Sequence, residues 1–168
     1  MNTEKMTYII AEAGVNHNGS LNMALELVDV AAHAGANAVK FQTFTAASLV
    51  SRLAPKAEYQ KKTTDTSESQ LEMLQRLELS VADHVALIER CHDRGIAFLA
   101  TPFDFESLDL LCSQFALDTI KVSSGDLTNA PLILEIGKRA RRVILSTGMS
   151  TLGEIESALG VLAFAFSA

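Results

Sequence analysis

Short apolar runs alternate with segments of helical periodicity along the chain, and this alternation restricts the fold more than any other feature. Each run ends in turn-forming residues and is followed by a helical pattern. The runs that we predict as strands are 7–13, 37–44, 96–103, 118–126 and 141–150. The residues at which we expect helices to start are Ser20, Ser69, Ser80, Asp104 or Ser107, Pro131 and Thr151. Successive strands are therefore expected to be joined by helices.

The predicted strands are continuously apolar, which is typical of a parallel sheet buried on both faces. No GxGxxG motif follows the first strand, so a dinucleotide-binding fold is disfavoured. We expect an α/β fold of the parallel (β/α)8 TIM-type barrel. A closed barrel of this kind takes ~250 residues, so the 168 residues here would supply about five strands of the eight. We therefore interpret residues 1–168 as the N-terminal portion of such a domain.

Composition limits the classes of function that the chain can have. Hydrophobic residues make up 48% and charged residues 20%, with a formal net charge of -6, as in ordinary globular proteins. Nothing in this balance favours nucleic acid, although locally converging lysines can still bind an anion. No apolar run reaches the ~18 residues of a membrane span. Cys91 and Cys112 lie in helical patterns and are expected to be core thiols of a cytoplasmic protein.

Polar residues gather where the predicted strands end, which is the active face of a barrel. The candidate site residues are Glu12, Lys40, Gln42, Thr101, Lys121, Ser124, Asp126 and Ser146. Lys40 and Lys121 lie between apolar neighbours on separate strands, and burying such a lysine is costly unless it is paired. Either one alone could pack its stem and extend its amine to solvent. Together they predict an anion site.

The carboxylates and histidines leave alternatives open. Glu12 either faces the site or forms a structural salt bridge with Lys40, and Asp126 either moves a proton or caps a turn. His17 lies in the glycine- and asparagine-rich loop after the first strand and could approach a ligand, whereas His33, His84 and His92 fall in helical patterns and are expected at the surface or in packing. No HxH or HExxH spacing is present, so no metal site is predicted within the chain.

A polar stretch from about Ala46 to Ser69 is longer than the usual connection of ~2–6 residues between a strand and a helix. A stretch of this length in a compact α/β protein is typical of a lid or a substrate loop.

Several long segments resemble one family in order and spacing, and the resemblance runs from Ile9 to the end of the chain. They are IIAEAGVNHNGS, AVKFQTF, APKAEYQ, ESQLEM, TPFD, KVSSGDLTNAPLI and ILSTGMS. Together they resemble the N-terminal half of the sialic acid synthases, a family that includes N-acetylneuraminate synthase and its legionaminate and pseudaminate relatives.

The resemblance implies a condensation of phosphoenolpyruvate with an N-acetylated aminosugar such as N-acetylmannosamine, which gives a nine-carbon 2-keto acid and phosphate. It also implies a divalent metal, Mn²⁺ or Mg²⁺, that polarises the sugar carbonyl. By motif, the residues that would bind phosphoenolpyruvate are Lys40, Lys121, Ser124 and Ser146, with Gln42 and Thr101 lining the same pocket. Glu12 would contact the sugar or the reacting centre, with Asp126 as the second catalytic carboxylate. The residues of the long loop that would help to cover the sugar are Lys56, Glu58, Tyr59 and Gln60.

The chain also departs from the family pattern. Asp126 stands where some members carry glutamate, which weakens its assignment to proton transfer. The family continues into further barrel strands that carry two metal-binding histidines, and into an antifreeze-like domain that completes the sugar pocket of the partner subunit in a homodimer. We therefore expect little or no turnover from this chain by itself.

Two other functions stay open. A truncated half-barrel, alone or as a swapped oligomer, would be a non-catalytic module, since unpaired strand edges favour swapping. A Schiff-base aldolase would use Lys40 or Lys121 as a nucleophile.

Overall fold

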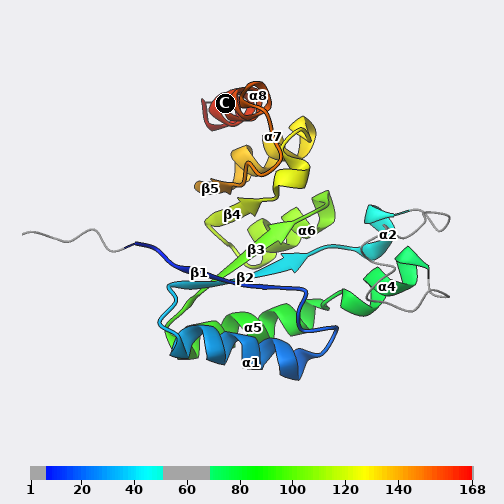
Figure 1. Ribbon diagram of the computed structural model, residues 1–168, viewed down its shortest axis with the longest axis vertical. Helices are drawn as coiled ribbons and strands as arrows, with labels where there is room; N and C mark the ends of the chain where they lie inside the picture. The colour runs from blue at the N-terminus through cyan, green and yellow to red at the C-terminus, as the bar shows by residue number, and fades with distance from the viewer. Residues whose placement is uncertain (1–6, 51–68, 168) are drawn as a thin grey trace, which may run out of the picture. The chain divides into compact units, whose positions relative to one another are not determined.

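The computed structural model describes residues 7–50 and 69–167 of the chain (Figure 1). Two compact units divide it, the first formed by Met1–Phe41 with Leu79–Leu99 and the second by Gln42–Glu78 with Ala100–Ala168. Strands and helices alternate in both units, as the sequence predicts.

The strands form two partial sheets. They are β1 (Ile10–Gly14), β2 (Ala38–Thr43), β3 (Ala97–Pro102), β4 (Thr119–Val122) and β5 (Arg142–Leu145). One sheet has the order β1-β2-β3 and the other pairs β4 with β5. The β1–β2 and β4–β5 pairs are both parallel. Parallel neighbours need a crossover connection, and a helix follows β1 and β4 before the next strand begins.

The first unit is built on two helices, α1 (Leu21–His33) and α5 (Val81–Arg94), which lie side by side below β1 and β2 in Figure 1. Their apolar faces share one core with the sheet, formed by residues such as Val28, Leu87 and Phe41, each fully buried. The expected helix starts are confirmed: Ser20 accepts a hydrogen bond from the Met23 amide, and Ser80 forms a reciprocal capping box with Asp83.

The second unit contains the remaining helices. They are α2 (Ala46–Leu49), α4 (Gln70–Leu77), α6 (Phe105–Asp109), the π-helix η1 (Leu110–Gln114), the 3₁₀ turn η2 (Ser124–Asp126), α7 (Ala130–Arg139) and α8 (Leu152–Ser167). The starts predicted at Ser69, Asp104 and Pro131 are confirmed by side-chain caps at Ser69 and Asp104 and by proline in the first turn of α7. Within the described ranges, no helix is long and apolar enough to cross a membrane.

Two expectations require correction. The polar stretch does not begin as a loop, because a short helix occupies Ala46–Leu49. The strands are not all buried on both faces, since β5 has an exposed Arg142 and only half-buried residues after it. The continuous apolar run predicts a strand there correctly, but it does not predict which neighbours cover that strand.

Candidate functional site

The first unit brings together two of the predicted site residues, one in the middle of β1 and one in the middle of β2. Glu12 lies opposite Lys40 in the parallel register. The Lys40 ammonium donates to Glu12 Oε1 at 2.9 Å and lies 2.7 Å from Oε2. The Lys40 side chain is only 11% exposed, whereas that of Glu12 is 57% exposed. A nearly buried ammonium is therefore held in the sheet by a carboxylate that still reaches solvent.

An irregularity in β1 lies directly beside this pair. Glu12 pairs with Lys40, but Gly14 pairs with Phe41, so β1 carries one more residue than β2 at this point. The backbone then leaves the sheet at Gly14, whose φ of 54° is a left-handed conformation that favours glycine. An extra residue of this kind re-aims the neighbouring side chains and bends the strand. The Glu12–Lys40 pair thus lies where β1 turns into its loop.

His17 belongs to this loop, and its side chain is fully buried. This corrects the expectation that it could approach a ligand directly. Its Nδ1 accepts a hydrogen bond from the Gly19 amide at 3.0 Å, and its ring lies 6.2 Å from that of Phe41. Its Nε2 has no hydrogen-bond partner in the described part of the chain. Burial, followed by the neighbouring His84, lowers the pKa of His17, so the imidazole is neutral near pH 7.

The second unit brings together Lys121, Ser124 and Ser146 at the ends of β4 and β5. Lys121 pairs with Ile144 in the register, and the Ser146 amide donates to the Val122 carbonyl at 3.2 Å. A methyl group at Gly148 would lie 3.6 Å from Ser124 Oγ, so the two strand ends approach closely there. The Lys121 ammonium donates to the Val122 carbonyl at 2.5 Å. A lysine, two serines and flexible backbone are groups from which an anion cradle is built.

Asp126 ends the 3₁₀ turn that follows β4. Burial raises the pKa of its carboxyl, and the Asn129 side chain opposes this shift by hydrogen bonding. A half-buried carboxyl with a raised pKa suits proton transfer better than a fully solvated one. The alternative of a simple cap is weakened, since Asn129 and not Asp126 caps α7.

Thr101 and Gln42 lie at the C-terminal ends of β3 and β2. Thr101 is 2% exposed, and among the described residues its hydroxyl has no hydrogen-bond partner. Buried hydroxyls are normally paired, so one without a partner is a candidate for binding a ligand. Gln42 is half-buried.

Sequence reasoning missed a polar connection in the second unit. Asp104 caps α6 through Ser107 and also accepts a hydrogen bond from the Thr45 amide at 2.8 Å. Glu78 accepts from the Ala46 amide at 2.9 Å. The Asp104 cap on Ser107 can be predicted from the sequence, because the two residues are three apart. The hydrogen bonds from the Thr45 and Ala46 amides join segments distant in sequence, so no local pattern predicts them. They fix the segment that follows β2.

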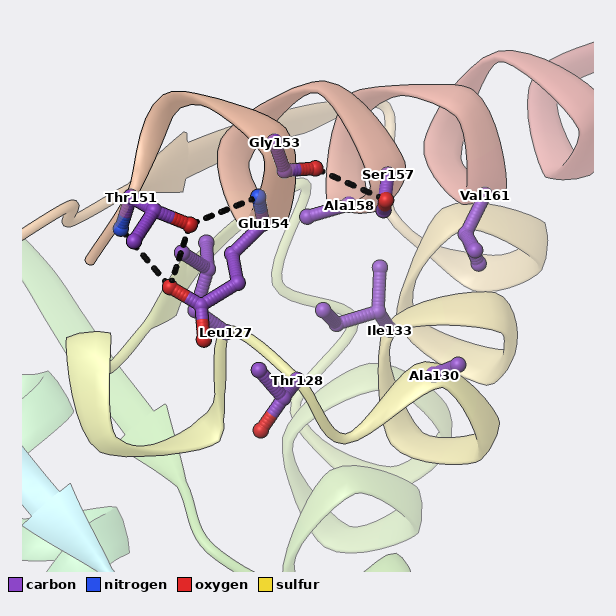
Figure 2. Close-up of a pocket in the computed structure, with 10 residues that line it drawn as sticks. All are labelled: Leu127, Thr128, Ala130, Ile133, Thr151, Gly153, Glu154, Ser157, Ala158 and Val161. Atoms are coloured by element: carbon purple, nitrogen blue, oxygen red, sulfur yellow. Dashed lines mark hydrogen bonds between the residues drawn. The ribbon is translucent and has the colours of Figure 1, made fainter.

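A cavity lies elsewhere, between α7 and α8 in the second unit. It measures about 370 Å³ and is lined by apolar side chains such as Ile133, Ala158 and Val161 (Figure 2). Several of its polar groups pair with each other: Glu154 accepts from the Thr151 amide and hydroxyl, and Ser157 donates to the Gly153 carbonyl. None of the predicted site residues lines it.

The predicted lid and the metal site remain to be placed. Lys56, Glu58, Tyr59 and Gln60 of the predicted lid lie outside the described residues. Across residues 7–50 and 69–167, no group of three or more histidine, cysteine, aspartate or glutamate side chains could hold a metal ion. The described residues thus offer no set of ligands for a divalent cation.

Comparison with known proteins identifies the family of this chain. Residues 27–166 match the model of the NeuB family. The chain is 54% identical over 158 residues to the N,N'-diacetyllegionaminic acid synthase of Campylobacter jejuni, covering 94% of this chain and 47% of the relative. It is 47% identical over 152 residues to the enzyme of the same name from Legionella pneumophila, covering 90% of this chain and 42% of the relative.

A solved structure gives the same result. The N-acetylneuraminic acid synthetase of Leptospira borgpetersenii, crystallised with citrate, superposes with a TM-score of 0.78 at 32% identity, over 95% of this chain and 50% of that one. These relatives are nonulosonic acid synthases. The chain belongs to the NeuB family, as its motifs predict. It spans about half the length of the curated relatives that it matches.

Proposed function

We propose that residues 1–168 form the N-terminal portion of a TIM-barrel synthase domain that condenses phosphoenolpyruvate with N-acetylmannosamine or a related N-acetylated aminosugar. The products would be a nonulosonic acid and phosphate. The observation that carries this proposal is the Lys40 ammonium, 11% exposed and paired with Glu12 across two parallel strands. Membership of the NeuB family supports the reaction class.

By the family motifs, the proposal assigns anion-binding groups to residues of both units, and each set is described within its own unit. Lys40 of the first unit would replace its partner Glu12 with an anionic group of phosphoenolpyruvate, since a nearly buried ammonium needs a negative partner. In the second unit, Lys121, Ser124 and Ser146 would bind phosphoenolpyruvate, with the unpartnered Thr101 hydroxyl and Gln42 as further donors.

The proposed chemistry divides between two carboxylates. C3 of phosphoenolpyruvate attacks the aldehyde carbon of the open-chain sugar, the aldehyde oxygen takes up a proton, and water adds at C2 before phosphate leaves. Glu12, once released from Lys40, would hold a sugar hydroxyl, and its 57% exposure leaves it accessible. Asp126 would move the proton, because burial raises the pKa of its carboxyl.

The divalent metal that the family resemblance implies would polarise the sugar aldehyde. The described residues do not provide a set of ligands for it. The steps assigned above therefore use only side chains of this chain.

A Schiff-base aldolase is a less suitable alternative. That chemistry requires a neutral lysine amine as nucleophile. Lys40 donates to a carboxylate and Lys121 donates to a carbonyl, so both amines already serve as hydrogen-bond donors. Borohydride trapping with a 2-keto acid should therefore give no covalent adduct on either lysine.

The proposal is tested by synthase activity with phosphoenolpyruvate, N-acetylmannosamine and Mn²⁺. The chain would be assayed alone and mixed with the C-terminal half of the Campylobacter jejuni relative. We expect release of phosphate and formation of the keto acid only in the mixture. Turnover by the chain alone would contradict the assignment of essential groups to the other half of the family domain. No turnover in either case, with the mixture shown to associate, would favour the non-catalytic module.

A further inference from the structure

His17 has an arrangement of hydrogen bonds that packing alone does not explain. Its ring is fully buried, and Nδ1 accepts from the Gly19 amide. A neutral imidazole carries its proton on the other nitrogen, so Nε2 is a buried N–H donor. That donor has no acceptor among the described residues. Burying an unpaired donor costs free energy, so an apolar residue of similar size would fill this position at lower cost.

The bond that His17 does make closes the loop after β1. The loop includes left-handed residues at Gly14, Asn18 and Gly19, and the Asn16, Asn18 and Ser20 amides donate to carbonyls within it. Acceptance by a side chain of the amide two residues later is the geometry in which asparagine and aspartate stabilise turns. Nδ1 of His17 therefore acts as the acceptor that holds the loop in one conformation.

The closed loop is coupled to the Glu12–Lys40 pair through β2. The His17 ring packs against Phe41, which neighbours Lys40 and points to the opposite face of the sheet. Phe41 is also the partner of Gly14, where the extra residue of β1 is accommodated. If the β1–β2 register shifted by one residue here, the Glu12 side chain would turn to the other face of the sheet. Its ion pair with Lys40 would then be lost.

We propose that His17 is a positioning residue, which holds the loop after β1 against Phe41 and thereby keeps Glu12 in register with the Lys40 ammonium. No contact with the proposed substrate is assigned to it, because its Nδ1 is engaged by the Gly19 amide and its ring packs against Phe41. The importance of this role for binding phosphoenolpyruvate rests on the proposed function, but the positioning itself can be measured without any substrate.

The experiment measures how fast N-hydroxysuccinimidyl acetate acetylates each lysine. Peptide mass spectrometry gives the rate for each one. In the wild-type chain, Lys40 should react slowly, because it is nearly buried and paired. In His17→Leu, which keeps the apolar packing but removes the acceptor, we expect Lys40 to react about tenfold faster through local opening. His17→Asn, which restores an acceptor for the Gly19 amide, should return the rate to within about twofold of wild type.

Lys121 in the second unit is the internal control, and His33→Leu on the exposed surface of α1 is the control variant. A merely structural role of His17 would loosen the whole chain and raise the rates of Lys40 and Lys121 together, and that result would overturn the proposal. An unchanged Lys40 rate in His17→Leu would overturn it as well. If His17→Leu does not fold, His17→Gln replaces it, because the longer amide does not reproduce the short acceptor geometry of asparagine.

Phosphoenolpyruvate provides a separate arm of the same experiment. Protection of Lys40 in the wild-type chain would support the proposed function. Absence of protection would count against the proposed function alone, because the comparison of the His17 variants needs no ligand.

Discussion

Lys40 and Glu12 face each other across the β1–β2 pair, with the ammonium 2.7 Å from Glu12 Oε2. The two side chains differ greatly in exposure, since the lysine is nearly buried and the glutamate is largely in solvent. A pair of this kind stabilises the fold only weakly, because solvent screens the exposed partner. Its main consequence is to keep a positive charge at this position of β2.

Replacement of Glu12 separates these two effects. Glu12→Gln should lower the free energy of unfolding by no more than ~1 kcal/mol, because the pair is screened on the glutamate side. The same change should not weaken phosphoenolpyruvate binding, since it removes a carboxylate that competes for Lys40. Urea unfolding and calorimetric titration measure the two quantities. A loss of several kcal/mol would mean that the pair is a structural element and not a preformed anion site.

Thr101 should show a conflict between stability and binding. Thr101→Val replaces the unpartnered hydroxyl with a methyl group of the same shape, and we expect the free energy of unfolding to rise by up to ~1 kcal/mol. Phosphoenolpyruvate affinity should fall at the same time. Thr101→Ser is the matched control: it keeps the hydroxyl and should cost ~0.8 kcal/mol for the lost buried carbon while preserving affinity. A destabilised Thr101→Val would indicate that the hydroxyl has a partner.

At Gly137, even the addition of one methyl group should destabilise the fold. A Cβ at this position would lie 2.5 Å from Ala165 Cβ, so α7 and α8 would have to separate. We expect Gly137→Ala to lower the free energy of unfolding by ~1–3 kcal/mol. Gly160→Ala, also in a helix but with open space around it, should instead raise it by ~0.5–1 kcal/mol. Addition of Ala165→Gly should recover part of the Gly137→Ala loss, and a failure to recover would disprove the proposed contact.

Acidification should destabilise the first unit through its buried histidines. Burial is the largest cause that lowers the pKa of both His17 and His84 in the folded chain below the usual 6.5. The unfolded chain therefore binds more protons than the folded chain below pH 6.5, so stability is lost as the pH falls from about 6.5 towards the folded-state pKa values. Unfolding midpoints in urea at pH 7.5, 6.5 and 5.5 measure this loss. His17→Asn should reduce it and the exposed His33→Gln should not, whereas equal pH dependence in all three chains would contradict this assignment.

Local signals in the sequence predict much of the fold. The starts of α1, α4, α5 and α6 follow from serine and aspartate caps, which act within one turn and are encoded by adjacent residues. The parallel pairing follows from the apolar strand runs and the helices between them. The family motifs add the reaction class, and the matched relatives confirm the family.

Long-range contacts account for what the sequence does not predict. The segment IIAEAG does not indicate an extra residue at Ala13, because that irregularity exists only against β2. For the same reason the sequence leaves two roles open for Glu12, a site residue or a salt-bridge partner of Lys40. Only the structure places Lys40 opposite it. His17 reads as a loop residue near a ligand, but Phe41 from the next strand packs against it and the ring is fully buried. The roles of the site residues in binding and catalysis stay predictions.

Binding of phosphoenolpyruvate to this chain tests the central claim most directly. Calorimetric titration would compare the wild-type chain with Lys40→Met, which keeps the length and packing of the side chain but removes its charge. We predict measurable binding to the wild-type chain and a loss of about tenfold or more in the variant, as expected for a charge-assisted contact worth ~1.5–3 kcal/mol. Equal affinity of the two chains, or no binding to the wild-type chain, would contradict the assignment of Lys40 to the phosphoenolpyruvate site.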